Sequence, residues 1–302
     1  MLRRDFLKLN AIGILGCGLS FPFAGDAFAA DPYLVVAKGE PGPATRAAVQ
    51  GLGGMARFVQ PGQKVVIKPN MSFDQGPAAA VNTHPDVVRE LVVMCKEAGA
   101  GKIRVLDHSL HNPRQSLERS GILAACDSVE TGICHHLMSG SQYAEATIPD
   151  GKEMRKNAFM KDVLEADVII AAPVAKSHSS AGVSLCLKGQ MGLIQDRHVM
   201  HSRYDLDVSI VDLATRVKPA LSVVDATRVL TSGGPGGPGR IITPGEVIAS
   251  ADPVAADAMA VSSYEWYGRK QKPRQVAHIR LAHERGLGRM DIDALNVARI
   301  AV

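Results

Sequence analysis

The segment Lys64-Val65-Val66-Ile67-Lys68-Pro69-Asn70 shows the pattern that decides the fold. Three consecutive β-branched residues form a short apolar run, and a lysine, a proline and an amide follow at once. A run of this kind is typical of a strand that is buried on both faces, as the strands of parallel sheets are. We therefore expect a strand at Lys64–Ile67 whose carboxyl end opens into a polar loop.

The same pattern recurs along the chain, with amphipathic stretches between the apolar runs. Further strands are expected at Tyr33–Ala37, Ile103–Leu106, Asp167–Ala171, Leu221–Val224 and Val247–Ala249, and helices at Pro85–Ala98, Val208–Val217, Pro253–Trp266 and Gln275–Arg285. Thr83 and Asp252 are the expected N-caps of the first and third of these helices. The alternation predicts an α/β fold, a mostly parallel sheet with helices on both faces. A polar, turn-rich stretch near 145–155 is a soft boundary, so one domain and two α/β lobes both stay open.

The N-terminus has the pattern of a twin-arginine signal peptide. It combines the pair Arg3-Arg4, an apolar run over residues 11–23 and the small-x-small site Ala27-Phe28-Ala29. The apolar run is shorter than the roughly 20 residues that a membrane-spanning helix needs. We expect residues 1–29 to be removed and residues 30–302 to work in the periplasm, with the twin-arginine translocase as the partner during export.

A second fate for the N-terminus stays open. Ile14-Leu15-Gly16-Cys17 resembles a lipoprotein box, and acylation of Cys17 would tether the chain to a membrane. The alternative is that Cys17 is a small apolar residue of the signal core.

Composition excludes some classes of site and partner. The net charge is +4, aromatic residues make up 4% of the chain, and no Lys/Arg block interleaves with them, so nucleic-acid binding is not expected. Cys95, Cys126, Cys134 and Cys186 form no C-x-x-C pair, so the chain has no self-contained iron–sulfur motif. Cys126 and Cys134 are close enough in sequence to form a disulfide, or they stay free and buried.

Charged and polar residues cluster where expected strands end, and in open α/β sheets ligands bind beyond the carboxyl ends of strands. The densest stretch, residues 173–201, follows the strand Asp167–Ala171. Lysines supply charge to phosphate or carboxylate, and histidines bind metals or move protons. We expect ligand-binding roles for Lys68, Asn70, Lys176 and Gly189, catalytic roles for His178 and Lys188, and metal-binding roles for Asp107, His198 and His201. The alternative for residues 173–201 is a solvated basic helix and loop.

A glycine-rich loop at Ser232–Gly239 adds a further candidate. The backbone amides of Gly234 and Gly236 are expected to bind an anion, although the loop matches no nucleotide motif and a flexible connector is the alternative. Asp257 either faces the site or favours the dipole of its helix.

Four ordered motifs resemble the domain of unknown function 362 family. They are Ile67-Lys68-Pro69-Asn70, Lys176-Ser177-His178, Leu187-Lys188-Gly189-Gln190-Met191-Gly192 and Ala251-Asp252-Pro253-Val254-Ala255-Ala256-Asp257. The resemblance covers roughly Tyr33 to Gly288. Some members of that family carry a ferredoxin-like cysteine cluster, which this sequence lacks.

The segment from His178 to Lys188 is similar to one segment of the nickel-dependent lactate racemases, His-x-x-Ala-Gly-x-Ser-x-x-x-Lys. This resemblance implies that His178 is an acid/base, that Lys188 carries a nickel-pincer nucleotide and that His198 or His201 binds nickel. Leu185-Cys186-Leu187 departs from the pattern, since it replaces a glycine run.

The sequence thus predicts an exported α/β protein that binds an anionic small molecule, a metal or a cofactor, and acts by Lys/His acid–base chemistry if it is an enzyme. Two alternatives remain: a non-catalytic periplasmic binding or cofactor/metal maturation factor, and a racemase- or isomerase-like enzyme. The cofactor, the substrate and the oligomeric state are left open.

Overall fold

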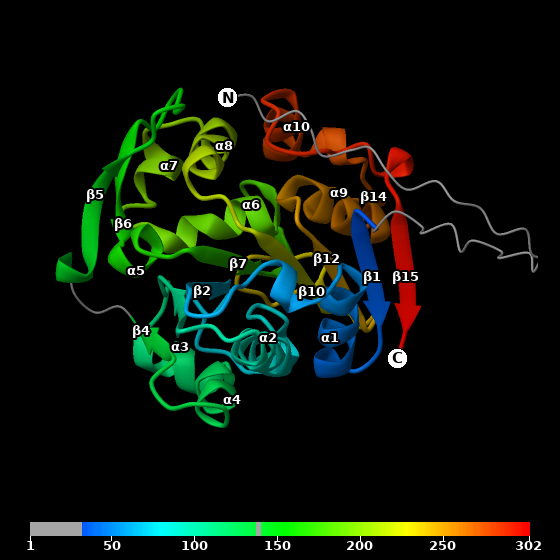
Figure 1. The fold of residues 1–302 in the computed structure, drawn as a ribbon. Helices are drawn as coiled ribbons and strands as arrows, with labels where there is room; N and C mark the ends of the chain where they lie inside the picture. The colour runs from blue at the N-terminus through cyan, green and yellow to red at the C-terminus, as the bar shows by residue number, and fades with distance from the viewer. Residues whose placement is uncertain (1–31, 137–139) are drawn as a thin grey trace, which may run out of the picture. The chain divides into compact units, whose positions relative to one another are not determined.

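The computed structural model of the protein describes residues 32–136 and 140–302 (Figure 1). The twin-arginine motif, the apolar run and Cys17 lie outside the described residues, so export and tethering stay predictions. Within the described ranges, no helix is both long enough and apolar enough to cross a membrane. The chain from Asp31 to Val302 is one compact unit.

A large sheet runs through this unit in the strand order β15-β1-β12-β10-β7-β2-β3-β4. The strands are β1 (Leu34–Lys38), β2 (Lys64–Pro69), β3 (Lys102–Asp107), β4 (Cys134–His136), β7 (Val168–Ala172), β10 (Leu221–Leu230), β12 (Glu246–Ser250) and β15 (Val297–Ala301). Parallel pairing joins β10, β7, β2, β3 and β4 in succession and also β1 to β15, whereas β12 is antiparallel to both of its neighbours. The predicted mostly parallel α/β sheet is confirmed.

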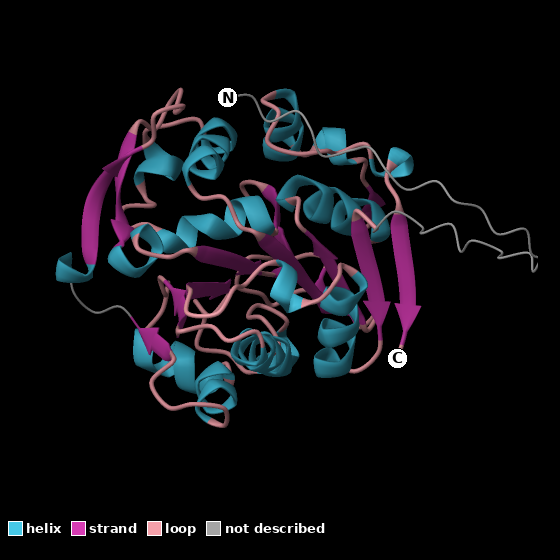
Figure 2. Ribbon diagram, viewed as in Figure 1, coloured by secondary structure: helices cyan, strands magenta, loops and turns pink. Residues whose placement is uncertain are grey.

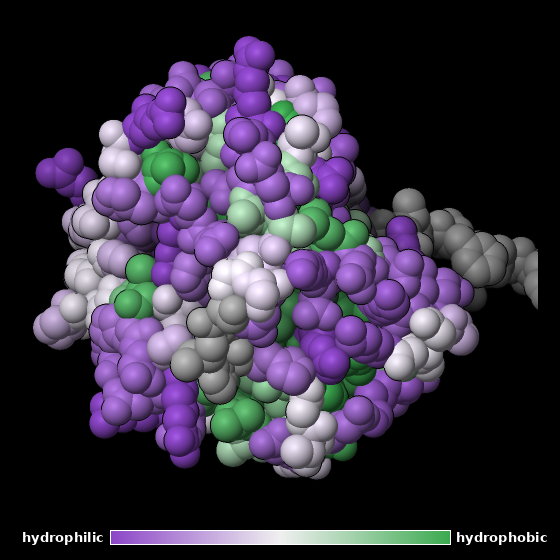
Figure 3. Space-filling model, turned by 90° about the vertical axis from the view of Figure 1, so that its left-hand side faces the viewer, coloured by the Kyte–Doolittle hydropathy of each residue, from purple (hydrophilic) through white to green (hydrophobic). Residues whose placement is uncertain are grey.

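Helices cover both faces of the sheet (Figures 1 and 2). One face carries α1 (Pro41–Gly51), α2 (Pro85–Glu97), α3 (Pro113–Arg119) and α4 (Ile122–Asp127), and the other carries α6 (Cys186–Gly189), α8 (Leu206–Arg216), α9 (Pro253–Ser263) and α10 (Ala277–Glu284). Short helices α5 (Lys161–Leu164) and α7 (Val199–Ser202) lie in the connections. The surface drawn in Figure 3 is mostly hydrophilic, with hydrophobic residues in separate patches.

The two faces bury two separate cores because successive strand residues point to opposite sides. Val65 and Ile67 of β2 pack with α1 and α2, whereas Val66 between them packs in the core beneath α8 and α9. All three side chains are at most 2% exposed. The continuous apolar run in the sequence therefore reflects a strand that is covered on both sides.

Several details differ from the expectations. The edge strands β4 and β15 were not expected, and the strand expected at Leu221–Val224 continues to Leu230 as β10. The N-cap of α2 is His84, not Thr83, because the Thr83 hydroxyl donates to the Ala172 carbonyl (2.7 Å) instead. The helix expected at Pro253–Trp266 ends at Ser263, and its last residues form β13 (Glu265–Trp266). Residues 145–155 belong to an antiparallel hairpin of β5 (Tyr143–Thr147) and β6 (Lys156–Met160), within the same compact unit.

Candidate functional site

A cavity of about 300 Å³ opens where several strands of the sheet end. Because β2, β3 and β7 are parallel neighbours, Lys68, Asp107 and the segment after Ala172 reach the same edge. The segment continues as β8 (Val174–His178), which pairs with β9 (Gly182–Ser184), and then enters α6. The lining residues are Lys68, Asn70, Ser72, Phe73, Asp107, Leu110, Lys176, His178, Ser184, Lys188, Gly189, Met191, Gly192, Arg197, His198, His201 and Pro235.

The cavity brings together every expected site residue except Gly234 and Gly236. Residues that the sequence did not single out also line it, among them Ser184 and Arg197. Ser184 lies opposite Lys176 in the β8–β9 pair, and this register was not visible in the sequence. Arg197 lies between the predicted site residues Lys188 and His198 in the sequence. Its position in this charged stretch was the one sequence feature that could have indicated a place in the site.

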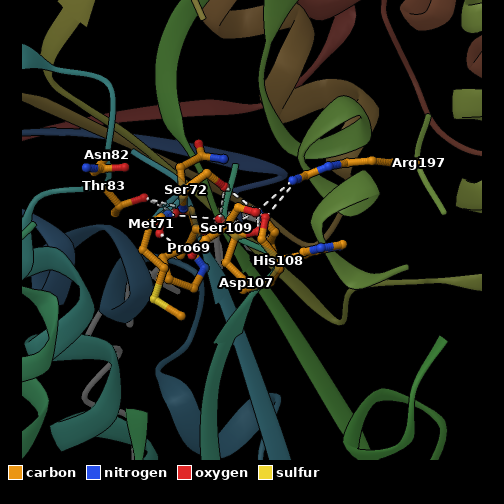
Figure 4. A network of polar contacts seen from close by, with 12 residues as sticks. Pro69, Met71, Ser72, Asn82, Thr83, Asp107, His108, Ser109 and Arg197 are labelled. Carbon is orange, nitrogen blue, oxygen red and sulfur yellow. Dashed lines mark hydrogen bonds and ion pairs between the residues drawn. The ribbon is translucent and has the colours of Figure 1, made fainter. Parts of the chain in front are cut away.

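The Lys68 ammonium and the Asp107 carboxylate form a buried ion pair at the base of the cavity. Lys68 Nζ lies 3.1 Å from Asp107 Oδ1 and donates to the Pro69 carbonyl at 2.7 Å. Asp107 Oδ2 accepts from the Met71 amide (2.9 Å) and the Ser72 hydroxyl (2.8 Å) (Figure 4). Burial lowers the pKa of Lys68, and Asp107 opposes that shift. The pair therefore fixes the loop after β2 while leaving little of either charge for a ligand.

Asn70 fixes the start of the next strand. Its Oδ1 accepts from the Val174 amide at 3.0 Å, and its backbone N–H donates to Thr83 Oγ1 at 2.8 Å. The side chain is 7% exposed and lines the cavity. Asn70 thus holds β8 against the loop after β2.

Lys176 is held by neutral partners. Its Nζ donates to the Val81 carbonyl at 2.6 Å and lies 4.5 Å from the centre of the Phe73 ring, a cation–π arrangement. The side chain is 2% exposed, and burial together with the nearby Lys188 lowers its pKa well below the ordinary value.

Lys188 differs from the other cations of the cavity, because its ammonium makes no hydrogen bond or ion pair with any described residue. Burial lowers its pKa to about 8, and the positive charges of Arg197 and Lys68 act in the same direction. An amine that is desolvated and surrounded by cations is available to an anionic or electrophilic ligand.

Asp257 positions the short helix that carries Lys188. From α9, its carboxylate accepts from the amides of Cys186 (2.7 Å) and Leu187 (3.0 Å), the first residues of α6. The carboxylate is fully buried, and burial raises its pKa to about 6 against the effect of these two amides. Asp257 therefore caps α6 and does not face the cavity, while Asp252 caps α9 as expected.

Arg197 closes the side of the cavity next to β3. Its guanidinium donates to the backbone carbonyls of His108 (2.7 Å) and Ser109 (3.0 Å) (Figure 4). Burial lowers its pKa. Among the described lining residues, the positive side chains Lys68, Lys176, Lys188 and Arg197 face a single carboxylate, that of Asp107.

His178 is a neutral hydrogen-bond donor. Its Nδ1 lies 3.2 Å from the Ser180 amide and 3.3 Å from the Ala181 amide, so Nδ1 accepts and we assign the ring proton to Nε2. Burial lowers its pKa to about 3, with Lys188 as the next contribution. The His201 ring stacks on it with centroids 6.1 Å apart.

The described residues contain no group of three or more His, Cys, Asp or Glu side chains arranged to hold a metal ion. His198 and His201 are exposed at the rim, while Asp107 is committed to Lys68, Met71 and Ser72. The expected metal role of these three residues therefore has no support in the geometry. The nucleotide implied by the racemase resemblance fits no better, since Leu185, Cys186 and Leu187 are at most 1% exposed and packed in the core.

The glycine-rich loop packs closely against the site. The Gly234 amide donates to Ser177 Oγ (3.0 Å), and a Cβ at Gly234 would stand 1.8 Å from the Ser177 carbonyl oxygen. A Cβ at Gly236 would meet the Phe73 ring at 2.8 Å. These glycines allow close approach to β8 and Phe73, and neither of them lines the cavity. The Gly234 amide already donates to Ser177, while anion binding by the loop stays a prediction.

Cys95, Cys126, Cys134 and Cys186 are free and buried. Of the two possibilities for Cys126 and Cys134, the structure thus has the free thiols.

Three known proteins are similar to parts of this chain. The thylakoid-associated protein sll1697 of Synechocystis is 27% identical over 221 residues, which cover 70% of this chain and 66% of that protein. The lactate racemase apoprotein of Thermoanaerobacterium thermosaccharolyticum matches with a TM-score of 0.48 at 15% identity, over 76% of this chain and 57% of that one. A structural-genomics protein of Thermotoga maritima matches with a TM-score of 0.43 at 11% identity, over 82% and 60% of the two chains. This chain therefore spans less than two thirds of each of these proteins.

The sequence profile described as "Domain of unknown function (DUF362)" matches residues 65–262, which include the cavity-lining strands, the Lys188 helix and the capping aspartates. The chain belongs to this family.

Proposed function

We propose that this protein binds a small anionic molecule, bearing a carboxylate or a phosphate, in the cavity at the carboxyl edge of its sheet. The observation that carries the proposal is the Lys188 ammonium, which lies in a cavity with three other cations and has no partner among the described residues. An unpaired charge that is partly removed from water is unfavourable, and an anionic ligand reduces that cost.

The cavity offers a small ligand several distinct contacts. Lys188 supplies the charge, and His178 Nε2–H and the Ser184 hydroxyl, both on the β8–β9 hairpin, supply neutral hydrogen bonds. Lys68, Lys176 and Arg197 already bind protein groups, so their main effect is a positive potential. Such a site suits a molecule with one anionic group and one neighbouring oxygen.

Calorimetry against a panel of small carboxylates and phosphates tests this proposal. Wild type should bind at least one class, and Lys188→Met should lose that binding. Lys161→Met removes an exposed lysine outside the cavity and is the matched control. The proposal would be contradicted if no compound of the panel, at saturating concentration, gave a heat of binding or raised the melting temperature. Binding that survives Lys188→Met would contradict it as well.

A second candidate function is an enzyme that uses the Lys188 amine and the His178 Nε2–H group. It is favoured by the pKa of about 8 at Lys188, which leaves a usable fraction of neutral amine near neutral pH. Lys188→Arg separates the two candidates because arginine keeps the charge but has no nucleophilic amine. Turnover of a metabolite panel that is lost in Lys188→Arg, with ligand binding retained, supports an enzyme; unchanged turnover contradicts it.

We also propose that the twin-arginine translocase exports the chain to the periplasm. The support is the N-terminal sequence alone, Arg3-Arg4 with its apolar run and cleavage site. Arg3→Lys with Arg4→Lys should leave the precursor in the cytoplasm, as measured by fractionation. Mass spectrometry of the mature N-terminus distinguishes cleavage near Ala29 from acylation at Cys17.

A further inference from the structure

A small basic hairpin stands apart from the cavity's lining. It consists of β13 (Glu265–Trp266) and β14 (Arg269–Lys270), which pair antiparallel through the two-residue turn Tyr267-Gly268 (Figure 1). Both turn residues have positive φ, 54° and 74°, as in a type I′ hairpin. The hairpin is a defined feature of the fold with a fixed tip.

The base of the hairpin is anchored firmly. Trp266 is fully buried, donates from Nε1 to the Val261 carbonyl (3.1 Å) and packs edge-on against Tyr264. The Tyr267 amide donates to the Thr231 carbonyl at 2.9 Å. Thr231 in turn donates its amide to the carbonyl of the exposed Arg240, at 2.8 Å. The backbone of Arg240 is thus linked through Thr231 to the base of the hairpin.

The exposed side chains of this region are mostly basic. The side chains concerned are Arg240, Arg269, Lys270, Lys272 and Arg274, all exposed. None of them forms an ion pair with a described residue. The sequence from Trp266 to His283 contains neither aspartate nor glutamate, and the one acidic residue of the hairpin is the exposed Glu265, which lies opposite Lys270. We call these five residues and Tyr267 the basic hairpin surface.

Tyr267 is the second unusual feature. A bulky residue with positive φ is rare, and asparagine or glycine is the favoured choice at this position of a type I′ turn. The tyrosine is nevertheless 43% exposed and adds little to the core. Strained conformations of this kind cluster at functional sites. An exposed tyrosine beside lysines and arginines is the combination that anchors proteins in the headgroup region of a bilayer.

We propose that the basic hairpin surface docks on a membrane that contains anionic phospholipids, with the cations over the headgroups and Tyr267 inserted between them. Clusters of four to eight lysines and arginines recognise such surfaces by charge. A nucleic acid fits less well, because the surface has one aromatic side chain and its two strands are only two residues long each, too short to follow a groove. The inference does not rest on the function proposed for the cavity.

Co-sedimentation of the full chain with vesicles tests the inference. The measured quantity is the difference in binding between phosphatidylcholine vesicles and vesicles that also contain phosphatidylglycerol. Wild type should bind the anionic vesicles more tightly, and salt should weaken the difference. The combined variant Arg269→Gln, Lys270→Gln, Lys272→Gln, Arg274→Gln should lose the difference, by about fivefold in partition coefficient for each charge removed.

A matched control removes the same number of exposed charges from another part of the chain. It combines Lys152→Gln, Arg155→Gln, Lys156→Gln and Lys161→Gln, which lie in residues 152–161. This control should bind anionic vesicles like wild type. Equal loss in the two variants shows that net charge alone is responsible, and it overturns the inference. Equal binding of wild type to both vesicle types overturns it as well.

Tyr267→Asn gives an independent readout, because asparagine suits the turn better. The variant should be at least as stable as wild type in thermal unfolding but should bind anionic vesicles more weakly. Unchanged binding of Tyr267→Asn to anionic vesicles would contradict the proposed insertion of Tyr267 between the headgroups. Preference of the wild-type hairpin for a DNA or RNA oligonucleotide over anionic vesicles would replace the lipid by a nucleic acid.

Discussion

The Cα of Gly192 lies directly against the carboxylate of Asp107. A Cβ at Gly192 would stand 1.9 Å from Asp107 Oδ1 and 2.8 Å from Lys68 Cε, distances that real Cβ atoms do not reach. The buried pair of Lys68 and Asp107 is thus covered by a residue that must have no side chain. The glycine that ends Leu187-Lys188-Gly189-Gln190-Met191-Gly192 has a packing role at the site.

Gly192→Ala should therefore disturb the Lys68–Asp107 pair. We expect a loss of about 1–3 kcal/mol in the free energy of unfolding, as for other overpacked interiors. Urea unfolding measures it. Gly76→Ala is the control, because the nearest atom to its added Cβ is 3.9 Å away and its φ is negative. Equal stability of Gly192→Ala and Gly76→Ala would show that the pair moves aside freely.

Lys188→Met should weaken anion binding without destabilising the fold. Removing a charge-assisted contact lowers affinity about ten- to hundredfold. The melting temperature should stay or rise, because the variant no longer carries a partly buried ammonium without a partner. A lower melting temperature with unchanged affinity would make Lys188 structural.

Lys188 also predicts a pH dependence. Its folded pKa of about 8 lies below the ordinary lysine value of 10.5, so the unfolded state binds more protons between these pH values. Stability should therefore rise from pH 8 to 10.5, while anion affinity falls as the ammonium loses its proton. The stability slope should be smaller in Lys188→Met, where Lys68 and Lys176 alone of the cavity lysines contribute, and the pH-dependent affinity should be lost. Affinity that stays constant across this range in wild type would argue against a charged Lys188.

His178 should remain neutral at physiological pH. Its pKa of about 3 lies below the ordinary value of 6.5, so the unfolded state takes up a proton as the pH falls from 6.5 to 3 and stability is lost in that window. Nitrogen NMR should show an Nε2–H tautomer that does not titrate between pH 5 and 8. A titration midpoint near 6 would restore the acid/base role that the racemase resemblance implied.

Asp257→Asn should loosen the helix that carries Lys188. An amide oxygen replaces one of the two carboxylate contacts to Cys186 and Leu187, at a cost of about 1–3 kcal/mol. Anion affinity should fall with it. Asp205→Asn is the matched control: it makes the same change at the exposed N-cap of α8, where asparagine caps equally well. Equal stability of the two variants would mean that the cap does not position α6.

Local pattern was enough to predict six central strands of the sheet and the segments that carry the site, whereas the edge strands β4 and β15 and the β8–β9 pair were missed. Val65-Val66-Ile67 is apolar on both faces of the strand because helices cover both faces of the sheet. The apolar run in the sequence is therefore enough to predict that the strand is buried. The same rule predicted that Lys68, Asp107 and residues 173–201 follow strand ends, and parallel neighbours bring those ends to one edge. The helix boundary at Ser263 and the cap at His84 depended on tertiary contacts and were missed.

The sequence by itself determined which residues carry charge and that they follow strands, because strand burial and turn chemistry are local properties. Only the tertiary structure decided which charged side chains are paired with protein groups and which have no partner among the described residues. Lys68 is matched by Asp107, Lys176 by the Val81 carbonyl and Arg197 by two carbonyls, whereas Lys188 has no described partner. It also showed that Gly234 and Gly236 lie against Ser177 and Phe73, where a side chain would not fit. Hydrogen-bond partners of a buried group come from distant parts of the chain, so no local pattern contains them.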